Sequence, residues 1–207
     1  MKNSQHFLSV IVPVYQQEKT IVKNLSQIKN VLDKIRYPHE IIAVVDDQDK
    51  VISQVARKNH ANGRLHRETA ILLKNKNNEI LIQIREDDKT LDYSVLGHFH
   101  VDETYKQGAV REAREELGIE IEESDLVEIK KFRVDTGKGK YVNRRFTTLF
   151  EFTTDYKLED FNIDKNEVKA IAYYSSSSLK KIIKNNPEKM SEGLKNALKI
   201  YFKKRRL

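Results

Sequence analysis

Three glutamates within about one helical turn are the residues of this sequence whose types and spacing could do chemistry. Glu112, Glu115 and Glu116 are spaced so that a helix would place their carboxylates on one face. Like charges at this spacing destabilise an isolated helix. A hard divalent cation, which prefers oxygen ligands, would offset that cost. The spacing therefore indicates a metal site, and a charged helix face turned to solvent is the alternative for these three residues alone.

The residues around these glutamates predict both a helix and a loop that precedes it. An apolar residue at every fourth position forms a narrow stripe that can pack on a sheet: Ala109, Ala113 and Leu117. Gly118 is placed to end the helix in a left-handed cap. Arg111 can pair with Glu103 and hold the preceding loop against the helix.

The complete pattern from residue 97 to residue 119 resembles the Nudix box. It reads Gly-x5-Glu-x7-Arg-Glu-U-x-Glu-Glu-x-Gly-U, where U is apolar, and its fixed identities are Gly97, Glu103, Arg111, Glu112, Glu115, Glu116 and Gly118. A chance match is on the order of one in 10^8 per starting position. Looser similarity covers residues 40 to 205 and points to the subgroup of isopentenyl-diphosphate isomerase and its hydrolase-like relatives. The resemblance implies an α/β fold, a Nudix α/β/α sandwich with a mixed sheet between helices.

The resemblance also implies a hydrolase that cleaves the diphosphate linkage of a nucleoside diphosphate derivative or a related organic diphosphate. Glu112, Glu115 and Glu116 would bind Mg2+ or Mn2+, which neutralises the diphosphate and lowers the pKa of the attacking water. Glu112 or Glu116 would take the proton, and the choice between them stays open. Arg111 is assigned to the same catalytic group.

Two residues outside the motif are further candidates for the site. Arg85 ends an apolar strand and is the candidate phosphate contact, with a surface ion pair to Glu86 or Asp87 as the alternative. Glu167 precedes another strand and could supply a metal ligand or a base, with a solvated turn residue as the alternative.

Isomerisation is not the expected chemistry. The isomerase needs a cysteine as acid or base, and this chain has no cysteine. The isomerase's metal-binding glutamates on a later strand would fall near residues 142–144, where no carboxylate stands. His98 matches an isomerase metal ligand, but a histidine there also occurs in the relatives that hydrolyse. The missing cysteine also excludes a disulfide scaffold and thiolate metal sites.

Apolar periodicity predicts the elements that must position the motif. Strands are expected at residues 41–45, 51–55, 69–73, 80–84, 126–134, 145–152 and 168–174. The strands at 69–73 and 80–84 are expected to form a hairpin, because a polar turn joins them. A short helix is expected at 179–183. A last helix is expected to have Pro187 in its first turn and Leu194, Leu198 and Tyr201 on its docking face.

Residues 1–39 predict an N-terminal strand–helix extension, followed by the Nudix domain at 40–207. An apolar strand at 8–14 and an amphipathic helix at 21–35 make up the extension. Residues 1–49 also resemble the start of a family 2 glycosyltransferase, with Asp46 and Asp47 at the positions of its acidic residues. A transferase needs well over 100 further residues, which this chain gives to the Nudix region. The alternatives to a hydrolase are a non-catalytic nucleotide-binding Nudix module and a remnant or fusion of that transferase.

Charge and composition favour a small-molecule partner. The net charge is +7, but residues 179–207 hold ten Lys or Arg and two Asp or Glu, a balance of +8. A docked last helix whose cations face water explains this tail, so a nucleic-acid partner is disfavoured. The longest apolar run, residues 7–14, is interrupted and too short to span a bilayer, so no membrane partner is expected. The first residues make a poor signal peptide, which indicates a cytoplasmic location. A homodimer is left open.

Overall fold

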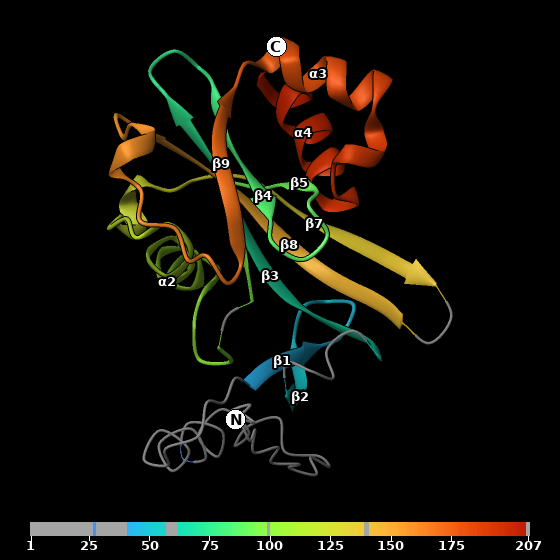
Figure 1. The fold of residues 1–207 in the computed structure, drawn as a ribbon. Coiled ribbons are helices and arrows are strands. Elements are labelled where there is room, and N and C mark those ends of the chain that lie inside the picture. The colour runs from blue at the N-terminus through green and yellow to red at the C-terminus, as the bar shows by residue number, and fades with distance from the viewer. Residues whose placement is uncertain (1–26, 28–40, 57–61, 99, 139–140, 206–207) are drawn as a thin grey trace, which may run out of the picture.

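A mixed sheet of nine strands forms the centre of the computed structural model, which describes residues 41–56, 62–98, 100–138 and 141–205 together with residue 27 (Figure 1). The strands are β1 (Ile41–Val45), β2 (Val51–Ala56), β3 (Asn62–Asn75), β4 (Ile80–Arg85), β5 (Leu91–Asp92), β6 (Val95–Gly97), β7 (Val127–Lys138), β8 (Tyr141–Thr154) and β9 (Val168–Tyr174). Among these strands β3 and β8 pair in parallel, and the other pairs are antiparallel.

Helices cover both faces of this sheet (Figure 1). The helix α2 (Tyr105–Leu117) lies on one face, and α3 (Ser176–Asn185) and α4 (Glu192–Arg205) lie on the other. Short 3-10 turns are η2 (Glu123–Asp125), η3 (Leu158–Asp160) and η4 (Pro187–Lys189). Because side chains alternate along a strand, Ile71 and Leu73 of β3 join the core under α2, while Ala70 and Leu72 join the core under α4. The expected α/β/α sandwich is confirmed.

The expected strands are confirmed, and so is the hairpin of β3 and β4, although its ladder is short. β3 and β4 are joined by a turn in which Asn75 N–H donates to the Glu79 carbonyl at 3.0 Å. Beyond that turn the ladder holds only the pair Lys74 and Ile80. Most of β3 has other partners: residues 65–75 pair with β8, and residues 69–71 pair with β6 on the other side. The polar turn predicts the short hairpin of β3 and β4, but it gives no signal for the long ladder between β3 and β8.

The position of Pro187 differs from the expectation. Pro187 begins the separate turn η4, and α4 starts five residues later at Glu192. Met190 lies between them in an extended conformation and is buried in the core under α4. The fixed φ of proline suits the first position of a 3-10 turn as well as that of an α-helix, so the residue alone does not distinguish them. The predicted strand at 8–14 and helix at 21–35 lie outside the described residues, apart from residue 27.

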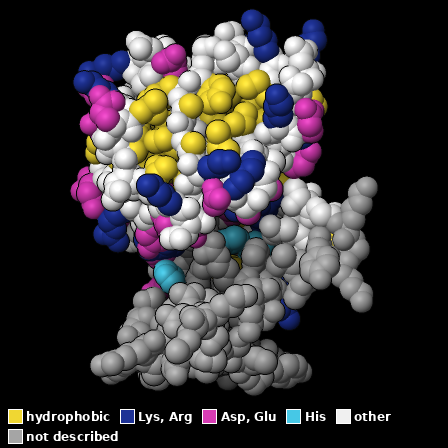
Figure 2. All heavy atoms as spheres, in the orientation of Figure 1, with side chains coloured by type: hydrophobic (Ala, Val, Ile, Leu, Met, Phe, Trp, Pro, Cys, Tyr) yellow, Lys and Arg dark blue, Asp and Glu magenta, His cyan; other side chains and the backbone are white. Residues whose placement is uncertain are grey.

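The last helix docks as expected, but two of its cations do not simply face water. Leu194, Leu198 and Tyr201 are buried against the sheet. Lys204 Nζ donates to the Ile129 carbonyl at 2.6 Å, and Arg205 pairs with Glu151, a buried residue of β8. On the face shown in Figure 2, the described basic side chains are interspersed with acidic ones around an apolar area. Lys204 and Arg205 therefore help to hold α4 against the sheet.

Replacing Arg205 by alanine is expected to lower the melting temperature. The change removes a cation from the carboxylate of Glu151, which is 4% exposed. Partial loss of such a pair costs about 1–2 kcal/mol, or roughly 3–6 °C for a chain of this size. Lys203→Ala, on the same turn and exposed, is the matched control. Equal melting temperatures for the two variants, measured by circular dichroism, would show that the Glu151 pair contributes nothing.

None of the described helices combines the length and the apolar character needed to cross a bilayer.

Candidate active site

The helix α2 begins and ends where local chemistry places its caps. The Thr104 side chain accepts from the Gln107 N–H at 3.1 Å, and the Gln107 side chain accepts from the Thr104 N–H at 2.9 Å. Gly118 ends the helix with a φ of 67°, a conformation that glycine adopts without strain. The predicted apolar stripe is fully buried: Ala109, Ala113 and Leu117. The predicted helix is confirmed, and its packing fixes where the three glutamates lie.

Glu116 lies at the junction of α2, β4 and β6. Its Oε2 accepts from Gln83 Nε2 at 2.7 Å and from the Leu96 N–H at 3.2 Å. Burial raises the pKa of this carboxyl well above its ordinary value, and the charges of Glu112 and Glu167 raise it further. Glu116 is therefore a buried carboxyl, held in one orientation by two donors and repelled by neighbouring carboxylates.

Glu112 lies directly against the backbone of Gly97. A Cβ atom at position 97 would lie 2.1 Å from Glu112 Cδ and 2.4 Å from each carboxylate oxygen. Real atoms cannot approach so closely, so this carboxylate position requires a residue without a side chain. Steric contact with Glu112 thus explains why the motif opens with a glycine.

Arg111 binds the loop and two of the three glutamates at once. Its Nε donates to Glu103 Oε1 at 3.0 Å, and its Nη2 donates to the His98 carbonyl at 2.8 Å. Its Nη1 lies 2.9 Å from Glu112 Oε1 and 2.7 Å from Glu115 Oε2. Burial alone would lower the pKa of Arg111, but the hydrogen bond to Glu103 and the three carboxylate charges hold it above its ordinary range. The expected pair between Arg111 and Glu103 is confirmed.

The donor set fits a hard divalent cation. Carboxylate oxygens are the ligands that Mg2+ and Mn2+ favour, and Glu112 raises the pKa of Glu116 because their charges are close. Within the described part of the chain, no three His, Cys, Asp or Glu side chains are already arranged as a metal site. Arg111 supplies the positive charge between Glu112 and Glu115. Glu112, Glu115 and Glu116 could hold a cation if Arg111 gives up these two contacts.

The two candidates outside the motif lie at one end of β4 and β9. Arg85 binds both oxygens of Asp87, at 3.0 and 3.1 Å, and lies 3.8 Å from buried Asp92. The surface ion pair considered for Arg85 is thus present, and its phosphate contact stays a prediction. Glu167 is exposed in the turn before β9, and its charge acts on Glu116. Glu167 is therefore a turn residue that also belongs to the surroundings of the site.

Sequence reasoning did not single out Gln83, which holds Glu116. The only signal in the sequence was that Gln83 is an amide inside the apolar run of β4. Its neighbours Ile82 and Ile84 belong to the opposite face of the sheet. His66 was assigned no site role either. It is fully buried, and its Nε2 lies 3.1 Å from His98 Nε2, beside the loop that Arg111 holds.

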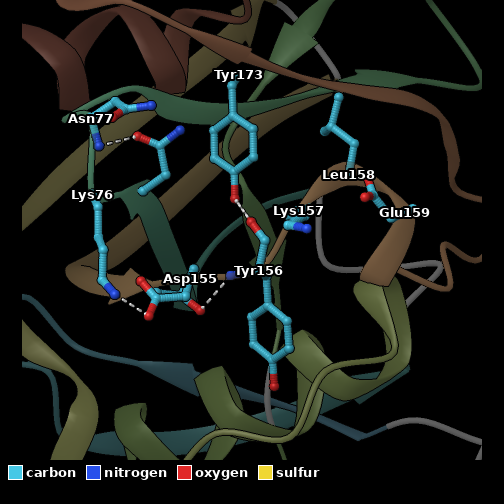
Figure 3. Close-up of a pocket in the computed structure, with 10 residues that line it drawn as sticks. Lys76, Asn77, Asp155, Tyr156, Lys157, Leu158, Glu159 and Tyr173 are labelled. Atoms are coloured by element: carbon cyan, nitrogen blue, oxygen red, sulfur yellow. Dashed lines mark hydrogen bonds and ion pairs between the residues drawn. The ribbon is translucent and has the colours of Figure 1, made fainter.

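A separate groove of about 580 Å³ lies at the other end of β9 (Figure 3). Tyr173 and Tyr156 line it, and the Tyr173 hydroxyl donates to the Tyr156 carbonyl at 2.8 Å. The ion pair between Lys76 and Asp155 lies at its rim (Figure 3). Tyr173 is six positions along the chain from Glu167, a distance of about 20 Å in an extended strand. This groove therefore contributes nothing to the carboxylate site.

Comparisons with known proteins agree with this geometry. A family model described as the NUDIX domain matches residues 64–195, more than half of the chain. Isopentenyl-diphosphate delta-isomerase of Aspergillus fumigatus is 28% identical over 192 residues, covering 72% of this chain and 65% of that protein. Nudix hydrolase 3 of Arabidopsis thaliana is 31% identical over 124 residues, covering 55% of this chain and 16% of that protein. The chain thus spans less than two thirds of either relative.

Solved structures extend the comparison to the fold. A crystal structure of a Deinococcus radiodurans protein superposes with a TM-score of 0.63 at 23% identity, covering 77% of this chain and 98% of that one. At this identity the likeness shows the fold.

Proposed function

This chain belongs to the Nudix hydrolase family, and on that premise we propose that it hydrolyses the diphosphate linkage of a nucleoside diphosphate derivative, or of a related organic diphosphate, with a divalent metal. One observation supports the proposal above all others. Glu116 is buried, held by Gln83 and the Leu96 N–H, and close to the carboxylate that lies against Gly97. A fold gains nothing in stability from two repelling carboxylates, one of them buried, whereas a phosphate-cleaving metal site needs them.

The residues can be assigned roles from their contacts. Glu112, Glu115 and Glu116 would hold Mg2+ or Mn2+, which when bound supplies charge neutralisation and an acidified water. Glu116 or Glu112 accepts the proton of the attacking water. The two donors to Glu116 keep its carboxyl in one orientation during that transfer. Arg111 holds the loop through Glu103 and the His98 carbonyl.

Arg85 and Glu167 are proposed to act on the substrate side. Arg85 is 35% exposed, and Asp87 orients its guanidinium through two hydrogen bonds, so it can present a donor to a phosphate oxygen. Glu167 is near enough for its charge to raise the pKa of Glu116. It could therefore complete the ligand set or share the role of base.

Isomerisation is disfavoured although one relative is named an isomerase. The chain has no cysteine to act as acid or base. Residues 142–144, where further acidic ligands would be expected from the resemblance, lie in β8 as Val-Asn-Arg. The non-catalytic alternative, a module that binds a nucleotide without cleaving it, does not need all three of Glu112, Glu115 and Glu116.

The test is a screen of nucleoside diphosphate derivatives and other organic diphosphates with purified protein. We expect release of a monophosphate product with Mg2+ or Mn2+, loss of turnover on adding EDTA, and recovery when metal is restored. Product analysis by chromatography distinguishes the hypotheses. Binding without cleavage under both metals would favour the non-catalytic module, and conversion without release of phosphate products would favour isomerisation.

A further inference from the structure

We propose that the β1–β2 hairpin, which precedes the residues matched by the family model, positions the catalytic loop of the Nudix domain through Asp49 and Tyr105. The loop is the segment between Gly97 and the start of α2. The family match begins at residue 64, whereas the hairpin spans residues 41–56. The activity part of this inference rests on the proposed function, and its structural part does not.

Asp49 is the centre of a cluster that joins four elements. The carboxylate is 13% exposed, although Asp49 lies in a turn. Arg67 of β3 donates from Nε to Asp49 Oδ1 at 2.7 Å and from Nη2 to the Asp49 carbonyl at 2.6 Å. Lys131 of β7 pairs with the same carboxylate. The Tyr105 hydroxyl donates to it across 3.2 Å.

Tyr105 connects this cluster to the catalytic helix. It is the first residue of α2, and its carbonyl accepts from Thr69 Oγ1 of β3 at 3.1 Å. Lys131 Nζ lies 4.5 Å from the centre of the Tyr105 ring, a favourable cation–π arrangement. Burial and the Asp49 carboxylate raise the pKa of the Tyr105 phenol, so it stays a donor. The start of α2 is thus fixed from both its side chain and its backbone.

The hairpin reaches the loop at a second point. Ile42 of β1 forms an antiparallel bridge with His100. The His100 N–H donates to Glu103 Oε2 at 2.7 Å, and Glu103 pairs with Arg111. Asp49 and Ile42 therefore hold the two ends of the segment from His100 to Tyr105, which carries the partner of Arg111.

The turn itself does not require Asp49. Asp46 makes the turn by accepting from the N–H groups of Gln48 and Lys50, both at 2.9 Å. Asp47 has an 80% exposed side chain that pairs with Arg133. Asp49 has a φ of 62°, which aspartate and asparagine tolerate better than most residues. Its inward carboxylate thus has a role beyond hairpin formation, and Asp46 and Asp47 are accounted for as turn residues.

The experiment compares Asp49→Asn with Asp47→Asn. Asparagine keeps the backbone conformation but removes the charge between Arg67 and Lys131. Because small displacements of catalytic groups cost up to about a hundredfold in rate, we expect kcat to fall at least about tenfold in Asp49→Asn with KM changed much less. Asp47→Asn should keep both constants. Hydrogen exchange should become faster in residues 100–105 of Asp49→Asn alone.

A second variant tests whether Asp49 acts through Tyr105. Tyr105→Phe removes one hydroxyl, and we expect it to lower kcat in the same direction. The double variant should be no slower than Asp49→Asn, because both changes break one connection. Additive losses, or unchanged exchange in residues 100–105, would overturn the inference. If the wild-type protein cleaves no diphosphate, the proposed function fails, and the exchange measurement still decides the positioning role.

Discussion

Replacing Glu116 by glutamine is expected to lower hydrolysis at least about a hundredfold at saturating Mg2+. Glutamine keeps the size of the side chain and can still accept from Gln83 Nε2 and the Leu96 N–H through its carbonyl oxygen. It removes the negative charge, which a metal ligand or a base needs. The expected loss is therefore chemical and leaves the shape of the site unchanged.

Stability should change in the opposite direction from activity in this variant. Glu116 is 5% exposed, and its raised pKa reports that the charged form is unfavourable in the folded protein. Removing the charge should raise the melting temperature of the metal-free protein. Glu120→Gln, an exposed glutamate just beyond α2, is the matched control and should change neither property. Full turnover by Glu116→Gln with Mg2+ present would refute the role assigned to this carboxyl.

The parts of the fold that sequence predicted are those in which local spacing determines the structure. The stripe of Ala109, Ala113 and Leu117 defined the buried face of α2, and Gly118 defined its end. The strands β1 and β2 were predicted from two short apolar runs, which flank an Asp-rich segment within 16 residues. In each case the residues that determine the element lie within it.

The parts that sequence did not predict depend on contacts between distant residues. The parallel pairing of β3 with β8 joins Ala70 to Leu149, and nothing in either segment identifies the other. Asp49 and Tyr105 are 56 positions apart, so neither residue type signalled their contact. Pro187 was compatible with the first position of an α-helix and with that of a 3-10 turn. The structure has the 3-10 turn, followed by Met190 packed in the core.

The same distinction applies to the candidate site. The motif identified its glutamates, glycines and arginine by spacing, and the pairing of Arg111 with Glu103 followed from that spacing. The side chain that orients Glu116 comes from β4, 33 positions away. Supporting residues of this kind are found only when the strand is placed beside the helix. They are also the residues through which a site is tuned without changing its motif.

Gly97→Ala is expected to change the activity of the site while leaving the stability of the fold almost unchanged. The added Cβ would lie 2.1 Å from Glu112 Cδ, so the carboxylate must move. The displaced group is the end of a flexible side chain, and Gly97 lies in an extended strand that alanine can adopt. We therefore expect little change in melting temperature, a loss of hydrolysis of at least about tenfold, and weaker Mn2+ binding by calorimetry. Mutating a residue that positions a metal ligand typically costs about 10–100-fold in metal affinity.

Gly193→Ala should give the opposite result and is the control for Gly97→Ala. A Cβ at position 193 would lie 3.1 Å from the hydroxyl of Tyr93, a residue that is 1% exposed and fixed in the core. Tyr93 cannot move away as Glu112 can, so overpacking should lower the melting temperature, while hydrolysis per folded molecule and Mn2+ affinity should stay near wild type. Normal Mn2+ affinity and turnover in Gly97→Ala would mean that Glu112 does not need its place beside residue 97. The metal role assigned to Glu112 would then be wrong, because a ligand displaced by a methyl group cannot bind as before.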